Sequence, residues 1–185
     1  YLCLSKSFKT QEDLTAVRFD APYFDVEGRF FRDQSSLENG VRVILHRTEG
    51  KSVLIDKKRL DRFSELIGKF PAVISAPEDV QIVTGPPGYR RRWMDMALSQ
   101  MQAMYLKDLQ DYRQTLKQRN ALLSSLSIRP DNLDVWDKEL ILTGSKIIRR
   151  RLEFVPSFAG LVGQVYRKIA ADGESVEIRY RSSIA

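Results

Sequence analysis

Residues 85–88 separate two kinds of hydrophobic pattern in this chain. Before them, apolar residues alternate in short runs bounded by turn-forming residues, which is typical of β-strands. After them, from Gly88 to Ala170, apolar residues recur at every third or fourth position, which is typical of α-helices. The Gly-Pro-Pro-Gly sequence at the change breaks regular structure and is not a flexible tether. The pattern therefore predicts an α+β fold in which a helical part follows a strand-rich part.

The first part contains a predicted β-hairpin. Val41–His46 and Ser52–Ile55 have strand composition, and Thr48–Lys51 between them contains a typical hairpin turn. Tyr23–Phe31 also has strand composition, and Ser35–Gly40 is predicted to be the turn that follows it. We therefore expect at least three antiparallel strands before the break.

Two shorter elements are expected between the hairpin and the break. Residues 58–68 predict a short amphipathic helix, since Leu60, Phe63 and Ile67 share one face. Ala72–Ile74 is predicted to be a buried strand that runs into an acidic turn.

The second part predicts an antiparallel helical hairpin. One apolar series runs at helical spacing from Leu98 to Leu126, stops at Ser127–Asn132, and a second series resumes at Leu133. Two helices joined by a short loop pack antiparallel. Pro156 should kink or interrupt the next stretch. After it we expect a third helix that turns four residues inward: Phe158, Leu161, Val165 and Ile169.

Three regions follow from these patterns. Residues 1–86 form the strand-rich part, and residues 87–172 form the helical lobe. Residues 173–185 return as a strand, because apolar residues alternate over Glu174–Tyr180.

Composition narrows the kinds of partner and chemistry. The 185 residues carry a net charge of +6, which moderately favours a polyanionic partner. No apolar run approaches the roughly 20 residues that span a membrane, so no membrane role is expected. Cys3 is the only cysteine, which excludes an internal disulfide and suits the reducing cytoplasm. His46 is the only histidine, so neither a zinc site nor a histidine-based triad is predicted.

Five stretches of the chain resemble one protein family. The run Ser75–Asp95, which contains Pro-Glu-Asp, Gly-Pro-Pro-Gly and three arginines, is similar to the "SPED…V.G.P..RR..D" segment of the bacterial RecF family. Four other stretches resemble RecF segments in the family's order: Tyr1–Thr10, Lys57–Gly68, Tyr112–Leu123 and Gly173–Tyr180.

This resemblance implies an ABC-type ATPase head. The strand-rich part would belong to the antiparallel region of an ATPase lobe, and the helical hairpin to a second lobe. RecF proteins bind ATP and Mg²⁺, form an ATP-dependent homodimer, and bind double-stranded DNA near single-strand gaps. They act with RecR and RecO to load the recombinase in DNA repair. The resemblance therefore implies ATP, Mg²⁺, DNA, RecR and RecO as cofactors and partners of the full-length protein.

The motifs of an active ATPase are absent from this sequence. No G-x-x-x-x-G-K-[ST] motif occurs, and no strand ends in the Asp-Glu of a Walker B motif. We therefore expect a middle segment of a larger ATPase that has no catalytic residues and no ATPase activity alone. Two alternatives stay open: another SMC-like head of the Rad50 or RecN type, which would carry longer coiled coils, or a non-enzymatic helical-hairpin interaction module.

The acidic turn has two open interpretations. In ABC-type heads the junction between lobes carries a glutamine that senses metal and phosphate, and its expected position here is near Ala76. Glu78, Asp79 or Gln81 could take that cofactor-binding role, because carboxylate and amide oxygens hold Mg²⁺ through water. Alternatively, Pro77 and the two acids begin a short helix, whose N-terminus stabilises negative charge.

Basic residues of the helical part are candidates for phosphate or DNA contact. Arg90, Arg91 and Arg92 lie in a first helical turn, where cations oppose the helix dipole and need a compensating partner. Phosphate is one such partner and a carboxylate is the other. Lys117 and Arg119 are further candidates on the predicted hairpin, where the alternative is an ordinary solvated helix face.

Overall fold

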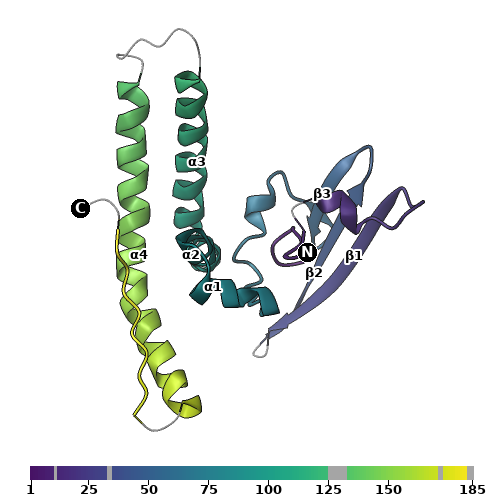
Figure 1. The fold of residues 1–185 in the computed structure, drawn as a ribbon. Helices are drawn as coiled ribbons and strands as arrows, with labels where there is room; N and C mark the ends of the chain where they lie inside the picture. The colour runs from purple at the N-terminus through teal and green to yellow at the C-terminus, as the bar shows by residue number, and fades with distance from the viewer. Residues whose placement is uncertain (11, 33–34, 125–132, 171–172, 183–185) are drawn as a thin grey trace. The chain divides into compact units, whose positions relative to one another are not determined.

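The computed structural model describes residues 1–10, 12–32, 35–124, 133–170 and 173–182 (Figure 1). The chain forms two compact units, Tyr1–Ala103 and Met104–Ala185. The first unit contains an antiparallel sheet and the second a helical hairpin, so the predicted α+β fold class is confirmed. The units divide later than residue 86, and the division into ATPase lobes stays a prediction.

The first unit is built on one four-stranded antiparallel sheet with the order β1-β2-β3-β4. The predicted strand at Tyr23 and the predicted hairpin are confirmed. The predicted turn at Ser35–Gly40 is wrong, because this segment begins β2 and pairs with the end of β1, with Glu38 opposite Phe31. The four strands are Tyr23–Arg32, Ser35–His46, Gly50–Ile55 and Lys58–Arg59.

One face of this sheet carries the core of the unit. Val41, Val43 and Val53 alternate along β2 and β3 and are fully buried together with Leu66. Valine favours strands because its branched side chain packs well on a pleated surface. The segment before β1 covers part of this face, since Leu2 packs against the bare backbone of Gly28.

A tight turn joins β3 to β4 and displaces the predicted helix over residues 58–68. Asp56 and Lys57 adopt φ of 49° and 69°, as a two-residue type I′ hairpin requires. The Asp56 carboxylate accepts a hydrogen bond of 2.7 Å from the Gly40 backbone N–H, which fixes this unusual conformation. The chain therefore continues as β4, and the only helical structure here is one 3₁₀ turn, Phe63–Glu65.

The predicted buried strand at Ala72–Ile74 is also wrong. The segment pairs with no strand, and the Val73 side chain is 99% exposed. The Ala72 backbone is instead paired with the Gln100 side chain. Its N–H donates to Oε1 at 2.8 Å, and its carbonyl accepts from Nε2 at 3.2 Å. A side-chain amide thus replaces the neighbouring strand that the apolar run implied.

The apolar series that predicts one helix from Leu98 is divided in the structure. Gln102 is extended, with φ of −140° and ψ of 105°, and it separates two helices. Spacing alone does not show this break, because the apolar period continues across it. The elements from the acidic turn to the hairpin are a 3₁₀ helix Pro77–Val80, α1 Gln81–Thr84, α2 Pro87–Met101 and α3 Ala103–Leu123.

The second unit is an antiparallel hairpin of α3 and α4, which spans Asp134–Ile169 (Figure 1). Contacts between the helices run in opposite order along them: Tyr105 meets Arg151, Tyr112 meets Gly144, and Arg119 meets Asp137. The predicted hairpin is therefore confirmed, and its predicted stop at Ser127–Asn132 lies outside the described residues. No helix in the described ranges is long and apolar enough to cross a membrane.

The end of α4 differs from the prediction. Pro156 does not end the helix, which continues to Ile169. Leu161 and Val165 were predicted to point inward but are 61% and 58% exposed. The reason is the register of the hairpin, because α3 begins opposite Arg151 and later α4 residues lack an α3 neighbour. The predicted strand over residues 174–180 is also wrong, since residues 173–182 form no strand.

Candidate functional site

The acidic turn is a capped helix start. The Asp79 Oδ2 atom accepts a hydrogen bond of 2.8 Å from the Ala76 backbone N–H, and Pro77 occupies the first helical position. This is the capping geometry that one of the two interpretations describes. The Glu78 side chain is exposed and makes no hydrogen bond or ion pair within the described part of the chain. Of the two acids, Glu78 therefore has the free carboxylate.

Gln81 is half-buried and lies against Gly85. A Cβ atom on Gly85 would come 2.5 Å from the Gln81 carbonyl oxygen and 2.7 Å from Gln81 Oε1. Only glycine allows this close approach. The Gln81 amide is therefore packed at the end of α1, and a ligand contact would require its side chain to turn away.

In the part of the chain that the structure describes, Arg90 is bonded neither to a carboxylate nor to a phosphate, the two kinds of partner that were predicted for it. Its Nη1 atom donates to the backbone carbonyls of Ile82 at 3.1 Å and Gly85 at 2.9 Å. These carbonyls lie at the C-terminal end of α1, where they lack partners within the helix and where a cation is favoured. The side chains of Arg91 and Arg92 are exposed and have no hydrogen bond or ion pair among the described residues.

The two basic candidates on the hairpin also differ from each other. Arg119 Nε pairs with Asp137 Oδ1 on α4, and this ion pair joins the two arms. Lys117 is exposed and has no ion pair in the described ranges. The geometry therefore leaves Lys117 available for an external phosphate and occupies Arg119 within the fold.

A layer of charged side chains, which the sequence analysis did not predict, lies inside the hairpin. Asp108 carries a charge, and charged side chains are usually exposed, but it is only 5% exposed here. Arg150 Nη1 lies 3.0 Å from Asp108 Oδ2, and Lys146 Nζ lies 3.9 Å from Oδ1. The Arg150 contact is an ion pair without aligned hydrogen-bond geometry. The available signal was spacing, because Asp108 follows the buried Tyr105 by three residues and therefore shares its face.

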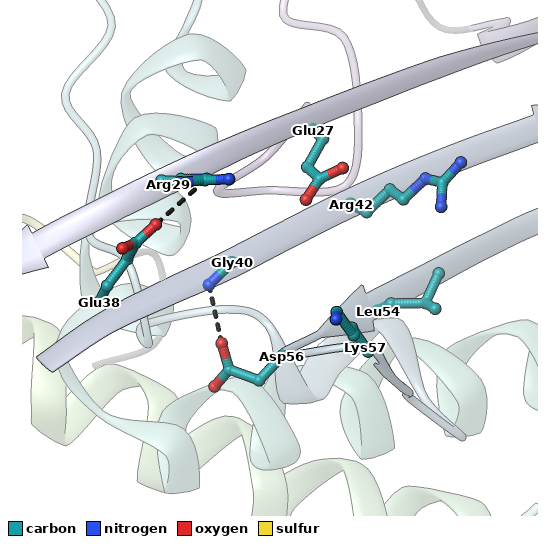
Figure 2. Close-up of a pocket in the computed structure, with 8 residues that line it drawn as sticks. All are labelled: Glu27, Arg29, Glu38, Gly40, Arg42, Leu54, Asp56 and Lys57. Atoms are coloured by element: carbon teal, nitrogen blue, oxygen red, sulfur yellow. Dashed lines mark hydrogen bonds and ion pairs between the residues drawn. The ribbon is translucent and has the colours of Figure 1, made fainter.

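The outer face of the sheet forms a shallow concavity of about 740 Å³ around Gly40 (Figure 2). Arg29 Nε pairs with Glu38 at 3.1 Å, and Asp56 accepts from the Gly40 N–H. Hydrogen bonds from Asn39 and then from Gly40 hold the pKa of Asp56 below its ordinary range. The eight lining residues are Glu27, Arg29, Glu38, Gly40, Arg42, Leu54, Asp56 and Lys57.

Two further ion pairs hold the sheet unit together. Arg42 Nε donates to Asp25 Oδ1 at 2.9 Å, and this hydrogen bond lowers the pKa of Asp25. Lys51 donates to the Ser5 carbonyl at 2.6 Å and to Asp13. Burial alone would raise the pKa of Asp13, but the hydrogen bond and charge of Lys51 lower it below its ordinary value. Within the described residues no group of three acid, histidine or cysteine side chains could hold a metal ion.

Comparisons with known proteins place this chain in context. No protein-family model matches it. It is 39% identical over 185 residues to the DNA replication and repair protein RecF of Salinibacter ruber, covering 97% of this chain and 45% of that protein. It is 37% identical over 188 residues to RecF of Chloroherpeton thalassium, covering all of this chain and 51% of that protein. The chain thus spans about half the length of the curated relatives it matches.

The solved structures agree with the sequences. A structure of the recombination mediator protein RecF with ATPrS in the RecFOR pathway superimposes with a TM-score of 0.84 at 27% identity. The match covers 91% of this chain and 46% of that one. The chain corresponds to a segment of RecF proteins. A second RecF structure, with ATP, gives a TM-score of 0.82 at 26% identity, so the RecF fold of this segment rests on both sequence and structure.

Proposed function

We propose that this chain supplies the lobe junction and the helical lobe of a RecF-like, ATP-dependent DNA-binding protein. That protein acts in recombinational repair of gapped DNA and in loading the recombinase. The observation that carries the proposal is the match to RecF proteins over 97% of the chain, together with a TM-score of 0.84. The parent protein is an ATPase in this proposal, and this segment contributes no catalytic residue to it.

The acidic turn is the nucleotide-facing part of the proposal. Glu78 has a free, exposed carboxylate, whereas Asp79 is engaged as a cap and Gln81 is packed against Gly85. This donor set fits one water-mediated contact to Mg²⁺ and does not make a metal site by itself. Mg²⁺ bound with ATP neutralises the charge of the phosphates. Glu78 would sense that charge, and the Asp79 cap would hold Glu78 in place.

The DNA-facing part consists of Arg91, Arg92 and Lys117. All three side chains are exposed and make no hydrogen bond or ion pair in the part of the chain that the structure describes. Arg90, in contrast, is bonded to backbone carbonyls, and Arg119 is paired with Asp137. Free cations of this kind bind the phosphate backbone without reading base sequence. The proposed ligand is double-stranded DNA near single-strand gaps.

The remaining proposals concern partners, assembly and location. The solved RecF structures are described as parts of the RecFOR pathway, which supports RecR and RecO as partners. We further propose an ATP-dependent homodimer that works in the cytoplasm. The length of the hairpin favours RecF over a Rad50- or RecN-type head, because α3 has only 21 residues and α4 begins at Asp134. No observation favours the non-enzymatic module.

The test measures DNA binding by the full-length protein that contains this segment. Replacing Arg91, Arg92 and Lys117 together by alanine should weaken binding to gapped duplex DNA. The slope of log affinity against log salt should fall by about 0.9 for each phosphate that the variant no longer neutralises. The matched control replaces Lys6, Lys9 and Lys58, three exposed lysines of the sheet unit, and should bind like the parent protein. Equal affinity and equal slope for both triple variants would refute the DNA assignment.

A further inference from the structure

The segment Ala72–Gly85, here named the α2 strap, carries the acidic turn and is fastened to α2 at both ends. At its start, Gln100 of α2 pairs with both backbone groups of Ala72, at 2.8 and 3.2 Å. At its end, Arg90 of α2 donates to the carbonyls of Ile82 and Gly85, at 3.1 and 2.9 Å. Gln100 and Arg90 are ten positions apart, so about 15 Å of one helix separates the two attachments.

Glycines allow close packing at the two attachments. A Cβ on Gly68 would lie 2.6 Å from the Gln100 carbonyl oxygen. The backbone φ of 86° at this position also favours glycine. A Cβ on Gly85 would lie 2.5 Å from the Gln81 carbonyl oxygen. Both contacts are with backbone atoms that cannot move aside easily. Close backbone approach therefore accompanies the Gln100 attachment, and at the other end it lies inside the strap, beside the carbonyls that Arg90 binds.

The strap has no comparable attachment to the sheet. Phe70, just before it, packs on Phe30 of β1 with ring centroids 4.4 Å apart, so the chain up to Phe70 belongs to the sheet core. Within the described part of the chain, no hydrogen bond joins residues 72–85 to a strand. The other hydrogen bonds of the strap are internal, such as that from Ala76 N–H to Asp79. Pro71 is the single residue between Phe70, which packs on the sheet core, and Ala72, which is bonded to α2.

We propose that Arg90 and Gln100 are positioning residues that make the α2 strap and α2 move as one piece. The inference rests on the proposed function, in which the acidic turn responds to nucleotide. Because both ends of the strap are bonded to one helix, a displacement of Glu78 is transmitted to α2. If only one end were attached, the strap could bend and absorb that displacement. Arg90 therefore serves coupling between nucleotide and helical lobe, not DNA contact.

The test uses the full-length protein and three measurements: ATP affinity, ATP-dependent dimerisation and melting temperature. Arg90→Met and Gln100→Leu remove the hydrogen bonds and keep side-chain size. Each should weaken ATP-dependent dimerisation by about tenfold, the factor that corresponds to one or two hydrogen bonds, while ATP affinity stays unchanged. Arg90→Lys, which retains a donor for the same carbonyls, should restore part of the loss.

Two controls separate coupling from simple loss of stability. Arg59→Met changes an exposed arginine of the sheet unit, to which no role is assigned, and should dimerise like the parent protein. Val53→Ala lowers the stability of the fully buried sheet core without touching the strap. It should lower the melting temperature and leave dimerisation at a temperature below melting unchanged. If Arg90→Met and Gln100→Leu do no more than Val53→Ala, the residues are structural and the inference is overturned.

The double variant Glu78→Gln/Asp79→Asn distinguishes the strap from the proposed function. If it weakens dimerisation and the strap variants do not, the strap inference fails alone. If the strap variants weaken dimerisation and the acid variant does not, the strap couples the lobes but the acids are not its sensor, and that part of the proposed function fails. If neither has an effect, both fail.

Discussion

The sheet and the helical hairpin bury different kinds of side chain. The sheet core contains Val41, Val43, Val53 and Leu66, and the Arg29–Glu38 and Arg42–Asp25 ion pairs lie on the opposite, outer face. The hairpin instead encloses Asp108 with Arg150. Apolar packing holds the sheet together without specifying direction, whereas a buried ion pair is satisfied in only one alignment of two helices. We therefore expect the sheet to depend on buried area and the hairpin to depend on its charged layer for its register.

The two units can be followed separately. The chain has two tryptophans, Trp93 on α2 in the first unit and Trp136 on α4 in the second. Single-tryptophan variants, in which the other tryptophan is replaced by phenylalanine, report the unfolding of one unit each. The following predictions use these two probes.

The largest effect is expected from Asp108→Ala. Removing one partner of a buried pair leaves the other charge uncompensated, and such changes cost about 3–5 kcal/mol. The free energy of unfolding reported by Trp136 should fall by this amount. The control is Asp111→Ala, which removes a half-buried acid three residues further along the same helix. This change should alter the free energy of unfolding by no more than about 0.5 kcal/mol. Equal effects of the two changes would show that the charged layer does not hold the hairpin.

A comparable or somewhat smaller effect is expected from Leu66→Ala in the sheet. Leu66 is fully buried, and truncating a buried leucine costs about 2–5 kcal/mol through lost transfer energy and a residual cavity. Urea unfolding followed at Trp93 should show the loss. Leu66→Met, which conserves volume, should cost less than about 1.5 kcal/mol. A loss seen equally at Trp93 and Trp136 would mean that the two units unfold together, which would break the comparison.

The smallest effect on the stability of the sheet unit is expected from lowering the pH. The pKa values of Asp13 and Asp25 are lowered in the folded protein, so the unfolded state binds more protons once the pH falls toward their ordinary value near 4. Their stabilising contribution is therefore present above about pH 4 and is lost as the pH falls through their lower folded-state pKa values. The Trp93 unfolding transition should therefore move to lower urea concentration as the pH falls below about 4.

The control for this pH dependence is the double variant Asp13→Asn/Asp25→Asn. It should be less stable than the parent protein at pH 7 and should lose less stability as the pH falls below about 4. An unchanged pH profile in the double variant would show that other carboxylates cause the acid sensitivity of the sheet.

Local pattern predicted those elements whose partners are also local. The strands at Tyr23, Val41 and Ser52 follow from alternation, and the hairpin that joins the last two follows from the Glu-Gly turn. The two arms of the helical hairpin follow from apolar spacing. The predicted helix over residues 58–68 failed because Asp56 binds Gly40, which is 16 residues away, and this contact stabilises a turn that lacks glycine.

The site was predicted as residue types but not as contacts. The sequence indicated that the acidic turn and the arginine run belong to one junction. It did not show that Gln100 pairs with Ala72, 28 residues away, or that Arg90 bonds to carbonyls of α1. Every residue has a backbone carbonyl, so the sequence does not indicate which carbonyl will accept a hydrogen bond from an arginine. The burial of Asp108 was not predicted for a related reason, because its partners lie on the other arm of the hairpin.

One measurement tests the proposed RecF function directly. The matching region of Salinibacter ruber RecF, which is 39% identical, can be replaced by this chain, and binding of the chimera to gapped duplex DNA measured with and without ATP. The account predicts ATP-dependent binding by the chimera and its loss in a chimera carrying Glu78→Gln and Asp79→Asn. A chimera that folds and binds ATP but shows no ATP-dependent DNA binding, or an acid variant that binds as well as its parent, would contradict it.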